Sequence, residues 1–267
     1  MNKEEVIKEL RIITKERGKS PTRRSIPLKL YYHCIKQFKY FNEAKKQAGL
    51  KLYNNRFLEL PPSSYIQDKD LVRLVSFLTF DGHLYKSLNA IILISKYKNE
   101  LKKYEKLIKN KFGLNGNYRL KADGFGESFN YRVYSKELGK LLNKFGTPRG
   151  DKMLTPFDVP NWIKENKEFT REYLKVAFYC EGCKYKTSEN TEIIQFNLNK
   201  SEELLEDGLK FIESLIYLLK EFNIETTKTW IMKGNLRKKD GKTTKMIKFK
   251  IKANSINKFI KEIGWIK

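Results

Sequence analysis

Two carboxylates occupy equivalent places in two similar segments of the chain. The segment Leu74–Gly82 (LVSFLTFDG) is mostly apolar and contains Asp81 before its final glycine, and Leu174–Gly182 (LKVAFYCEG) contains Glu181 at the same place. An apolar helix needs a partner, and two such helices can bury each other's faces along a local two-fold axis. A glycine after each acid stops the helix and permits a left-handed exit. Asp81 and Glu181 are therefore expected to lie side by side where the helices end.

Two adjacent carboxylates repel each other unless a divalent cation lies between them. Mg²⁺ favours carboxylate oxygens together with phosphate, and a shared metal can activate water and neutralise a phosphodiester. Asp81 and Glu181 are therefore predicted to be catalytic metal ligands, with the backbone carbonyls of Phe80 and Cys180 completing the shell. The predicted cofactor is Mg²⁺, with Mn²⁺ as an alternative.

The net charge indicates the class of partner. The chain has 55 Lys and Arg against 31 Asp and Glu, a net charge of +24, which favours nucleic acid. A membrane surface is the alternative for a basic protein, but the sequence has no long uncharged apolar run, signal peptide or lipidation motif. Its three cysteines are no disulfide framework and suit a reducing cytoplasm. We expect a cytoplasmic, nucleoid-associated protein.

Cys180 and Cys183 form a C-x-x-C pair, which leaves zinc binding and thiol chemistry open. A zinc site would need two more ligands, and His33 next to Cys34 is the only other cluster. We favour the interpretation of Cys180 as a small residue at the helix contact.

The elements around the two acids follow one order twice. The first part reads as a helix, two strands, a helix, a hairpin and a helix, at about 68–81, 83–86, 89–96, 99–112, 118–121, 129–135 and 136–145. The second part repeats this order at about 170–181, 183–187, 192–199, 201–222, 226–233, 243–252 and 255–263. The predicted fold is α+β, with two tandem αββαββα halves related by a pseudo-two-fold axis within a monomer.

Residues 1–60 are predicted to form a small all-α N-terminal domain. Helices are expected at about 4–17, 29–38 and 41–48, and this part has 15 Lys and Arg against 6 Asp and Glu. Short basic helices are typical of a helix-turn-helix-like DNA-binding module, with Arg23 and Arg24 as DNA contacts. The alternative is a helical cap that does not touch DNA. A Pro-Pro-Ser-Ser linker follows, which gives the domains 1–60, 61–152 and 153–267.

Strand alternation predicts one apolar and one polar face in each half, because successive side chains point to opposite sides. Amides and guanidinium groups on such a ribbon can read base edges in the major groove, and lysines neutralise phosphates. Any half-exposed sheet alternates in this way, but here the same pattern occurs in both halves of a very basic chain. The predicted DNA contacts on the strands are Arg119, Lys121, Arg132, Tyr134, Gln195, Asn197, Asn199, Lys248, Lys250 and Lys252.

The two apolar segments resemble the motif of the LAGLIDADG homing endonucleases. Leu74, Asp81 and Gly82 match the family motif, as do Leu174 and Gly182, whereas glutamate replaces the second aspartate. The resemblance implies a monomeric endonuclease that uses Mg²⁺ to cut both strands of double-stranded DNA at a long, asymmetric site.

The resemblance also implies a catalytic lysine. Residues 146–152 (GTPRGDK) resemble the G-x-P-x-G-x-K segment that places this lysine in the family, so Lys152 is the candidate. The second half stops without such a segment, so a symmetric second lysine is not expected.

The N-terminal domain resembles a small helical repeat that accompanies some homing endonucleases, through residues 18–22 (GKSPT) and 48–50 (AGL). Two other functions stay open. The first is a catalytically inactive protein on the same scaffold, either an intron maturase that binds RNA or a transcription regulator. The second is a basic nucleoid-like structural protein, which would not need two acids at matching helix ends.

Overall fold

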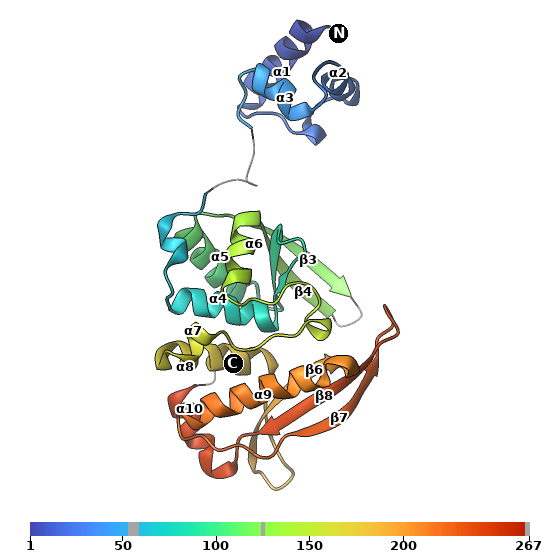
Figure 1. The fold of residues 1–267 in the computed structure, drawn as a ribbon. Coiled ribbons are helices and arrows are strands. Elements are labelled where there is room, and N and C mark those ends of the chain that lie inside the picture. The colour runs from blue at the N-terminus through green and yellow to red at the C-terminus, as the bar shows by residue number, and fades with distance from the viewer. Residues whose placement is uncertain (53–58, 124–125, 265–267) are drawn as a thin grey trace. The chain divides into compact units, whose positions relative to one another are not determined.

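Residue contacts divide the chain into two units, Met1–Asn55 and Arg56–Lys267. The structure is a computed structural model that describes residues 1–52, 59–123 and 126–264, and Figure 1 shows its helices and strands. No helix of these described residues is long and apolar enough to span a membrane.

The N-terminal unit consists of three helices. They are α1 (Lys3–Arg17), α2 (Leu28–Phe38) and α3 (Phe41–Gln47), with a 3₁₀ turn at Arg23–Ser25. Asn2 and Glu5 form a capping box at the start of α1, and Gly18 ends it with φ 63°, where glycine has no Cβ penalty. Val6, Leu10 and Ile13 of α1 are buried in one core with residues of α2 and α3. The predicted helices and their all-α arrangement are confirmed.

The larger unit contains the two predicted halves. The first comprises α4 (Lys69–Phe80), β1 (His83–Leu84), β2 (Ala90–Ser95), α5 (Lys98–Phe112), β3 (Asn117–Asp123), β4 (Gly126–Tyr134) and α6 (Lys136–Lys144). The second comprises α8 (Lys167–Glu181), β5 (Gly182–Lys186), β6 (Glu192–Ser201), α9 (Leu205–Lys220), β7 (Trp230–Leu236), β8 (Thr243–Lys250) and α10 (Ile256–Glu262). The α+β class and the doubled αββαββα order are confirmed.

The segment that joins the halves contains structure that the sequence did not predict. A 3₁₀ turn covers Lys152–Leu154, and the short helix α7 covers Asn161–Lys164. Part of the predicted turn of the first hairpin, residues 124–125, lies outside the described residues.

Each half has its own four-stranded antiparallel sheet, and the two sheets have the same topology. Their orders are β1-β2-β4-β3 and β5-β6-β8-β7. In the central pairs Ile92 lies opposite Arg132, and Asn197 lies opposite Lys248. Because the strand order repeats, β4 and β8 occupy the same place in the two halves, as do β2 and β6.

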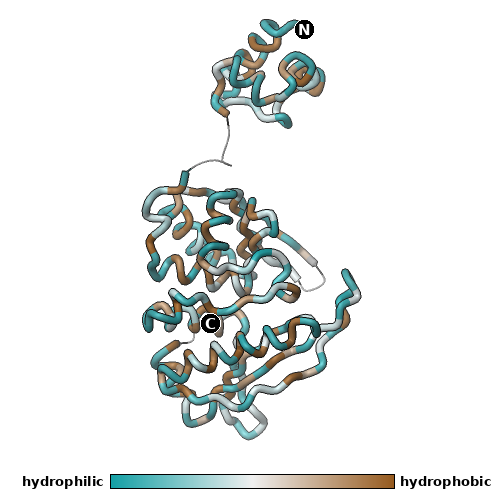
Figure 2. The backbone as a smooth tube through the Cα atoms, in the orientation of Figure 1, coloured by the Kyte–Doolittle hydropathy of each residue, from teal (hydrophilic) through white to brown (hydrophobic). Residues whose placement is uncertain are grey.

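The helices α4 and α8 pack against each other, which joins the halves through a common core. Residues 74–80 of α4 are all buried, as expected for a helix covered on more than one side. The ring of Phe80 lies 5.8 Å from that of Tyr173 on α8 and 6.1 Å from that of Phe196 on β6. Hydrophobic (brown) and hydrophilic (teal) residues alternate along most elements in Figure 2, which fits elements with one buried face.

Candidate active site and nucleic-acid interface

Both motif helices end at the predicted acids. Asp81 follows the last residue of α4, and Glu181 is the last residue of α8. The amide of Gly82 donates to the carbonyl of Phe77 at 2.8 Å and closes the end of α4. Asp81 is exposed and Glu181 is half-buried.

The predicted left-handed exit after each acid is wrong. Gly182 has φ −81° and ψ 148°, and Gly82 is not among the glycines with positive φ. Glycine is required at position 82 for space instead, because a Cβ there would lie 2.9 Å from the Cα of Leu78 and 3.0 Å from the carbonyl oxygen of Ile92. Strand β2 thus approaches the end of α4 closely.

The ends of the two helices meet. Cys180 on α8 lies close enough to Asp81 for the charge of that carboxylate to act on its thiol. Burial, followed by the negative charge of Asp81, raises the pKa of Cys180 well above its usual value. This thiol therefore stays protonated and marks the point at which the second motif contacts the first.

Lys152 lies beside these ends. Its ammonium donates hydrogen bonds to the carbonyl of Phe80 and, at 2.9 Å, to the carbonyl of Gly82, on either side of Asp81. Burial lowers the pKa of Lys152, while the charges of Glu181 and Asp81 act in the opposite direction. The structure thus brings together the residues predicted for catalysis from three segments.

The donor set at the helix ends consists mainly of oxygens, which fits Mg²⁺ or Mn²⁺. The Phe80 carbonyl accepts from Lys152 and keeps a second lone pair. Within residues 1–52, 59–123 and 126–264, no three His, Cys, Asp or Glu side chains cluster as metal ligands.

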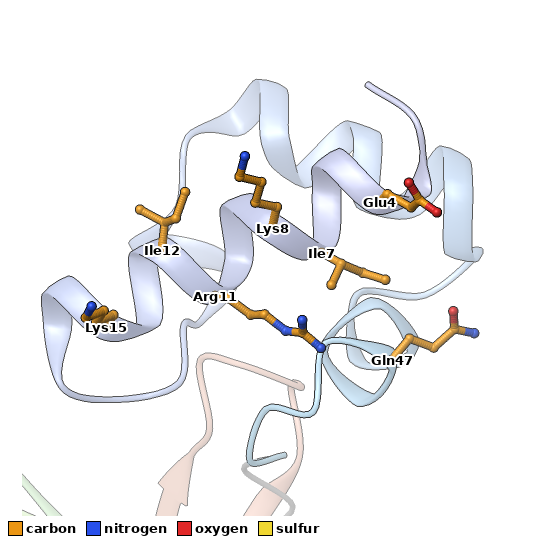
Figure 3. Close-up of a pocket in the computed structure, with 7 residues that line it drawn as sticks. All are labelled: Glu4, Ile7, Lys8, Arg11, Ile12, Lys15 and Gln47. Carbon is orange, nitrogen blue, oxygen red and sulfur yellow. The ribbon is translucent and has the colours of Figure 1, made fainter.

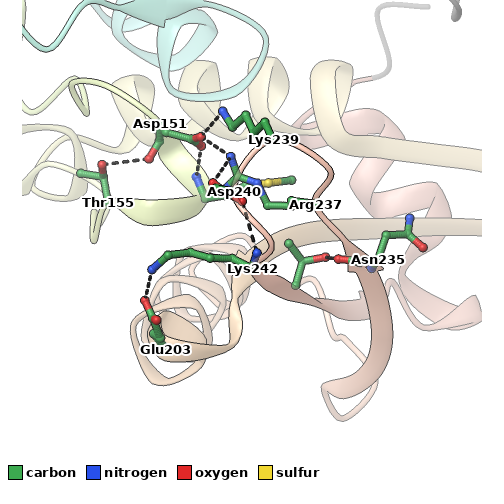
Figure 4. Close-up of polar contacts among 10 residues, drawn as sticks. Asp151, Thr155, Glu203, Asn235, Arg237, Lys239, Asp240 and Lys242 are labelled. Carbon is green, nitrogen blue, oxygen red and sulfur yellow. Dashed lines mark hydrogen bonds and ion pairs between the residues drawn. The ribbon is translucent and has the colours of Figure 1, made fainter.

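Asp151, next to Lys152, is paired with two basic residues from the turn between β7 and β8 (Figure 4). Its carboxylate accepts from the guanidinium of Arg237 and, at 2.6 Å, from Lys239. Burial opposes ionisation of Asp151, but the hydrogen bonds from Lys239 and Arg237 lower its pKa to about 2. This network was not predicted from the sequence, although Asp151 lies inside the segment that identified Lys152.

The polar face of the first sheet contains the predicted arginines. Arg132 on β4 donates to the hydroxyl of Tyr134 at 3.0 Å, and its guanidinium lies 5.7 Å from the ring centre of Tyr85. Arg119 on β3 lies opposite Asn130. Among the residues that the structure describes, the Nε of Arg132 and the Oδ1 of Asn130 are buried without a hydrogen-bond partner. This face therefore has an unused donor and an unused acceptor. Lys121, also predicted to contact DNA, is exposed on β3.

The polar face of the second sheet contains a row of amides. On β6, Gln195 donates to the side-chain oxygen of Asn197 at 2.7 Å. Gln195 lies opposite Lys250 and Asn197 opposite Lys248 on β8. The structure thus places five of the predicted contacts on one face: Gln195, Asn197, Asn199, Lys248 and Lys250.

Strand β8 ends at Lys250, so the predicted strand end at residue 252 is two residues too long, while the DNA contact of Lys252 stays a prediction. The ammonium of Lys252 lies 2.8 Å from a carboxylate oxygen of Glu225. It therefore follows the strand and pairs with an acid, so it does not extend the row of lysines on β8.

In the N-terminal unit Arg23 and Arg24 are exposed on the 3₁₀ turn. The guanidinium of Arg23 lies 4.9 Å from the ring centre of Tyr31 on α2. A shallow hollow lies along α1, and Figure 3 shows the side chains that line it: Glu4, Ile7, Lys8, Arg11, Ile12, Lys15 and Gln47. These basic residues were not predicted as a group from the sequence, although the spacing of Lys8, Arg11 and Lys15 places them on one side of a helix.

Comparison with known proteins gives similarity over part of the chain. No protein-family model matches it. It is 29% identical to the tRNA-splicing ligase RtcB of Methanopyrus kandleri over 69% of this chain and 22% of that protein. It is 32% identical to the replication factor C small subunit of Methanocaldococcus jannaschii over 58% of this chain and 9% of that protein. It is 29% identical to the RNA polymerase subunit Rpo1C of the same organism, over 51% of this chain and 15% of that protein. The chain therefore spans less than a quarter of these curated relatives.

Solved structures resemble it at lower identity. A structure of I-DmoI in complex with DNA and Mn is 15% identical, covers 77% of this chain and 99% of that chain, and has a TM-score of 0.45. The homing endonuclease I-WcaI bound to its DNA recognition sequence is 14% identical, covers 74% of this chain and 83% of that chain, and has a TM-score of 0.49. Full-length WhiA from Thermatoga maritima is 14% identical, covers 79% of this chain and 58% of that chain, and has a TM-score of 0.46.

Proposed function

We propose that the chain is a LAGLIDADG-type endonuclease that hydrolyses both strands of duplex DNA at a long, asymmetric site with a divalent metal. One observation carries the proposal. Two packed helices end at Asp81 and Glu181, and the ammonium of Lys152 is bonded on either side of Asp81. The net positive charge and the two polar sheet faces are suited to bind a polyanion such as DNA at this centre.

The residues of the centre have distinct roles in this proposal. Asp81 and Glu181 would hold the metal, with the carbonyls of Phe80 and Cys180 as further oxygen donors. When bound, the metal supplies charge neutralisation at the phosphate and activation of a water. Lys152 positions its ammonium at the end of α4, where it can donate to a reacting water or to the leaving oxygen.

The curated relatives support the proposal because they do not share one activity. Their names state three unrelated activities, and the matched part is 22%, 9% and 15% of the respective proteins. A segment common to proteins of different activity is unsuited to carry any one of those activities. This pattern fits a segment that occurs within different proteins independently of their own activities.

The test is cleavage of a randomised duplex-DNA library by the full chain, with Mg²⁺ and with Ca²⁺ in separate reactions. We expect discrete cut ends in Mg²⁺ that share a long sequence. The Asp81→Asn/Glu181→Gln double variant is the matched control and should produce none. DNA that is bound but uncut by the wild type in either metal would refute the proposal and would favour a regulator or a maturase, for which RNA would be the next ligand.

The N-terminal unit is proposed as an additional DNA-binding module. Lysine and arginine contacts to phosphate release counterions and make binding depend on salt. Deletion of residues 1–55 should therefore weaken binding of the selected duplex and flatten the plot of log Kd against log salt concentration. An unchanged slope and affinity would instead support the packing-cap interpretation.

A further inference from the structure

One buried charge in the larger unit lies outside the predicted centre. The side chain of Lys200, near the end of β6, has 0% exposure. In β6 it follows Ile194, Phe196 and Leu198 on the inward-facing side, so its direction could have been predicted from strand alternation. An inward ammonium is costly unless hydrogen bonds replace its water.

The contacts of Lys200 lead to the segment that carries Lys152. Its ammonium donates to the backbone carbonyl of Lys152 at 2.8 Å and to that of Thr155 at 2.7 Å. It also lies 3.7 Å from the ring centre of Phe157, which offers a cation–π contact. Burial lowers the pKa of Lys200 to about 8, and Asp207 opposes the shift.

The fold makes room for this side chain. Gly208 lies within helix α9, and a Cβ there would come within 2.9 Å of the Cγ of Lys200 and 2.6 Å of the Cδ1 of Ile247. Glycine inside a helix costs about 1 kcal/mol relative to alanine. Gly208 therefore destabilises helix α9 slightly but leaves space for the side chain of Lys200. Through this space Lys200 reaches the joining segment, residues 149–155.

Two other residues of the joining segment, Gly150 and Asp151, also form hydrogen bonds with the two halves. The amide of Gly150 donates to the carbonyl of Leu84, in the edge strand β1 of the first half, at 2.8 Å. Asp151 is bonded to Arg237 and Lys239 of the second half. Lys200 is the only one of these partners that bonds the backbone of Lys152 itself.

We propose that Lys200 is a positioning residue: it fixes the backbone of the joining segment so that the ammonium of Lys152 lies at the end of α4. This inference deepens the proposed endonuclease function and rests on it for the role of Lys152. Lys200 does not face the acids in this arrangement; it acts through the carbonyls of Lys152 and Thr155.

The first test measures hydrogen exchange of the peptide that covers residues 149–155 in the full chain, which requires no target DNA. Lys200→Met removes two charge-assisted hydrogen bonds, so exchange should be about 10-fold faster or more. Lys111→Met is the matched control. Lys111 is also buried, at 7% exposure, but donates to Ile66 and Asp68. Equal exchange rates in wild type and Lys200→Met would overturn the proposal.

The second test uses the selected duplex and measures single-turnover cutting at saturating DNA. Lys200→Met should slow cutting about 10-fold or more with unchanged DNA affinity. A double variant with Lys152→Met should be no slower than Lys152→Met alone, because the positioning effect needs the positioned amine. Multiplied losses in the double variant would overturn the proposal, since Lys200 would then act by another route.

The two tests separate the two proposals. A wild type that cuts no DNA refutes the endonuclease function, and the exchange rates then decide alone whether Lys200 fixes the segment. If circular dichroism shows that Lys200→Met does not fold, Lys200→Gln is used in the exchange experiment instead. An amide can reach one carbonyl at most, so an exchange rate above that of the wild type supports the proposal and an unchanged rate contradicts it.

Discussion

The two halves of the larger unit share a topology but present different chemistry on their polar sheet faces. In the first half the central strand β2 is apolar, and Ile92 and Ile94 lie opposite Arg132 and Asn130 of β4. In the second half the equivalent strand β6 bears a row of amides opposite the lysines of β8. Polar groups thus come from one central strand in the first half and from both in the second.

The buried parts of the two halves are alike, and the exposed parts differ. The strand order is the same in both halves, and α4 packs on α8 between them, because buried faces determine both features. The exposed faces are free to diverge, since they contribute little to the core. Two different faces on one scaffold are suited to a target whose two half-sites differ, as in the proposed asymmetric site.

The largest expected effect concerns the two acids, which the comparison treats as equivalent. Asp81→Asn or Glu181→Gln should each lower cutting of the selected duplex by about 10³-fold or more, because either loss removes a charged ligand from a shared site. Affinity for DNA should be retained, since both changes remove negative charge. Single-turnover rates and gel-shift titrations measure the two quantities. If cutting persists after only one of the two changes, the acids at the ends of α4 and α8 are not equivalent in function.

The next effect tests the asymmetry of the centre. Lys152 bonds the carbonyls at the end of α4, and such a residue contributes about 10²–10⁴-fold when it transfers or donates a proton. Lys152→Met should therefore slow cutting by about 10²-fold. We expect the loss to be larger on one strand, so that nicked duplex accumulates when each strand carries a separate end label. Equal losses on both strands would show that the lysine serves both cuts.

A smaller effect on DNA binding is expected from substitutions on the two polar sheet faces. Arg132→Ala removes a side chain whose Nε has no partner among the described residues, whereas Asn197→Ala removes one amide from a hydrogen-bonded row. A good bidentate base contact contributes about 1–3 kcal/mol of discrimination, so Arg132→Ala should weaken binding tenfold or more and Asn197→Ala about a few-fold. Each variant should relax base preference in one half-site only. Competition with single-base variants of the target measures this.

The sequence predicted the repeated architecture because its signals are local. The element order was predicted from strand alternation and from the glycines that end helices. The repeated apolar segment predicted that Asp81 lies near the end of the second motif helix. The sequence did not predict the space requirement at Gly82, which arises from the carbonyl of Ile92 on β2, nor the end of β8 before Lys252. It also missed the bonds of Lys200 and Asp151, because these join residues 48 and 86 positions apart. Such tertiary contacts leave little trace in local patterns.

The smallest expected effect concerns the bond between the joining segment and the second half. The folded pKa of Asp151, about 2, lies below the ordinary value of 3.8. The ionised carboxylate therefore stabilises the fold at every pH above about 4, and this contribution is lost as the pH falls towards 2. Because the Asp151 side chain is 30% exposed, solvent screening reduces this contribution to about 1 kcal/mol. Asp151→Asn should thus lower the free energy of unfolding by about that amount at pH 7.

Urea titrations of wild type and variant between pH 2 and pH 7 measure this difference, which should shrink below pH 4. Asp158→Asn is the control, because Asp158 pairs with Lys164 but has a side chain that is 49% exposed, and such pairs contribute little. A difference between wild type and Asp151→Asn that stays constant down to pH 2 would mean that the ionised carboxylate is not what stabilises the contact. The turn between β7 and β8 would then be attached to the Lys152 segment by packing alone.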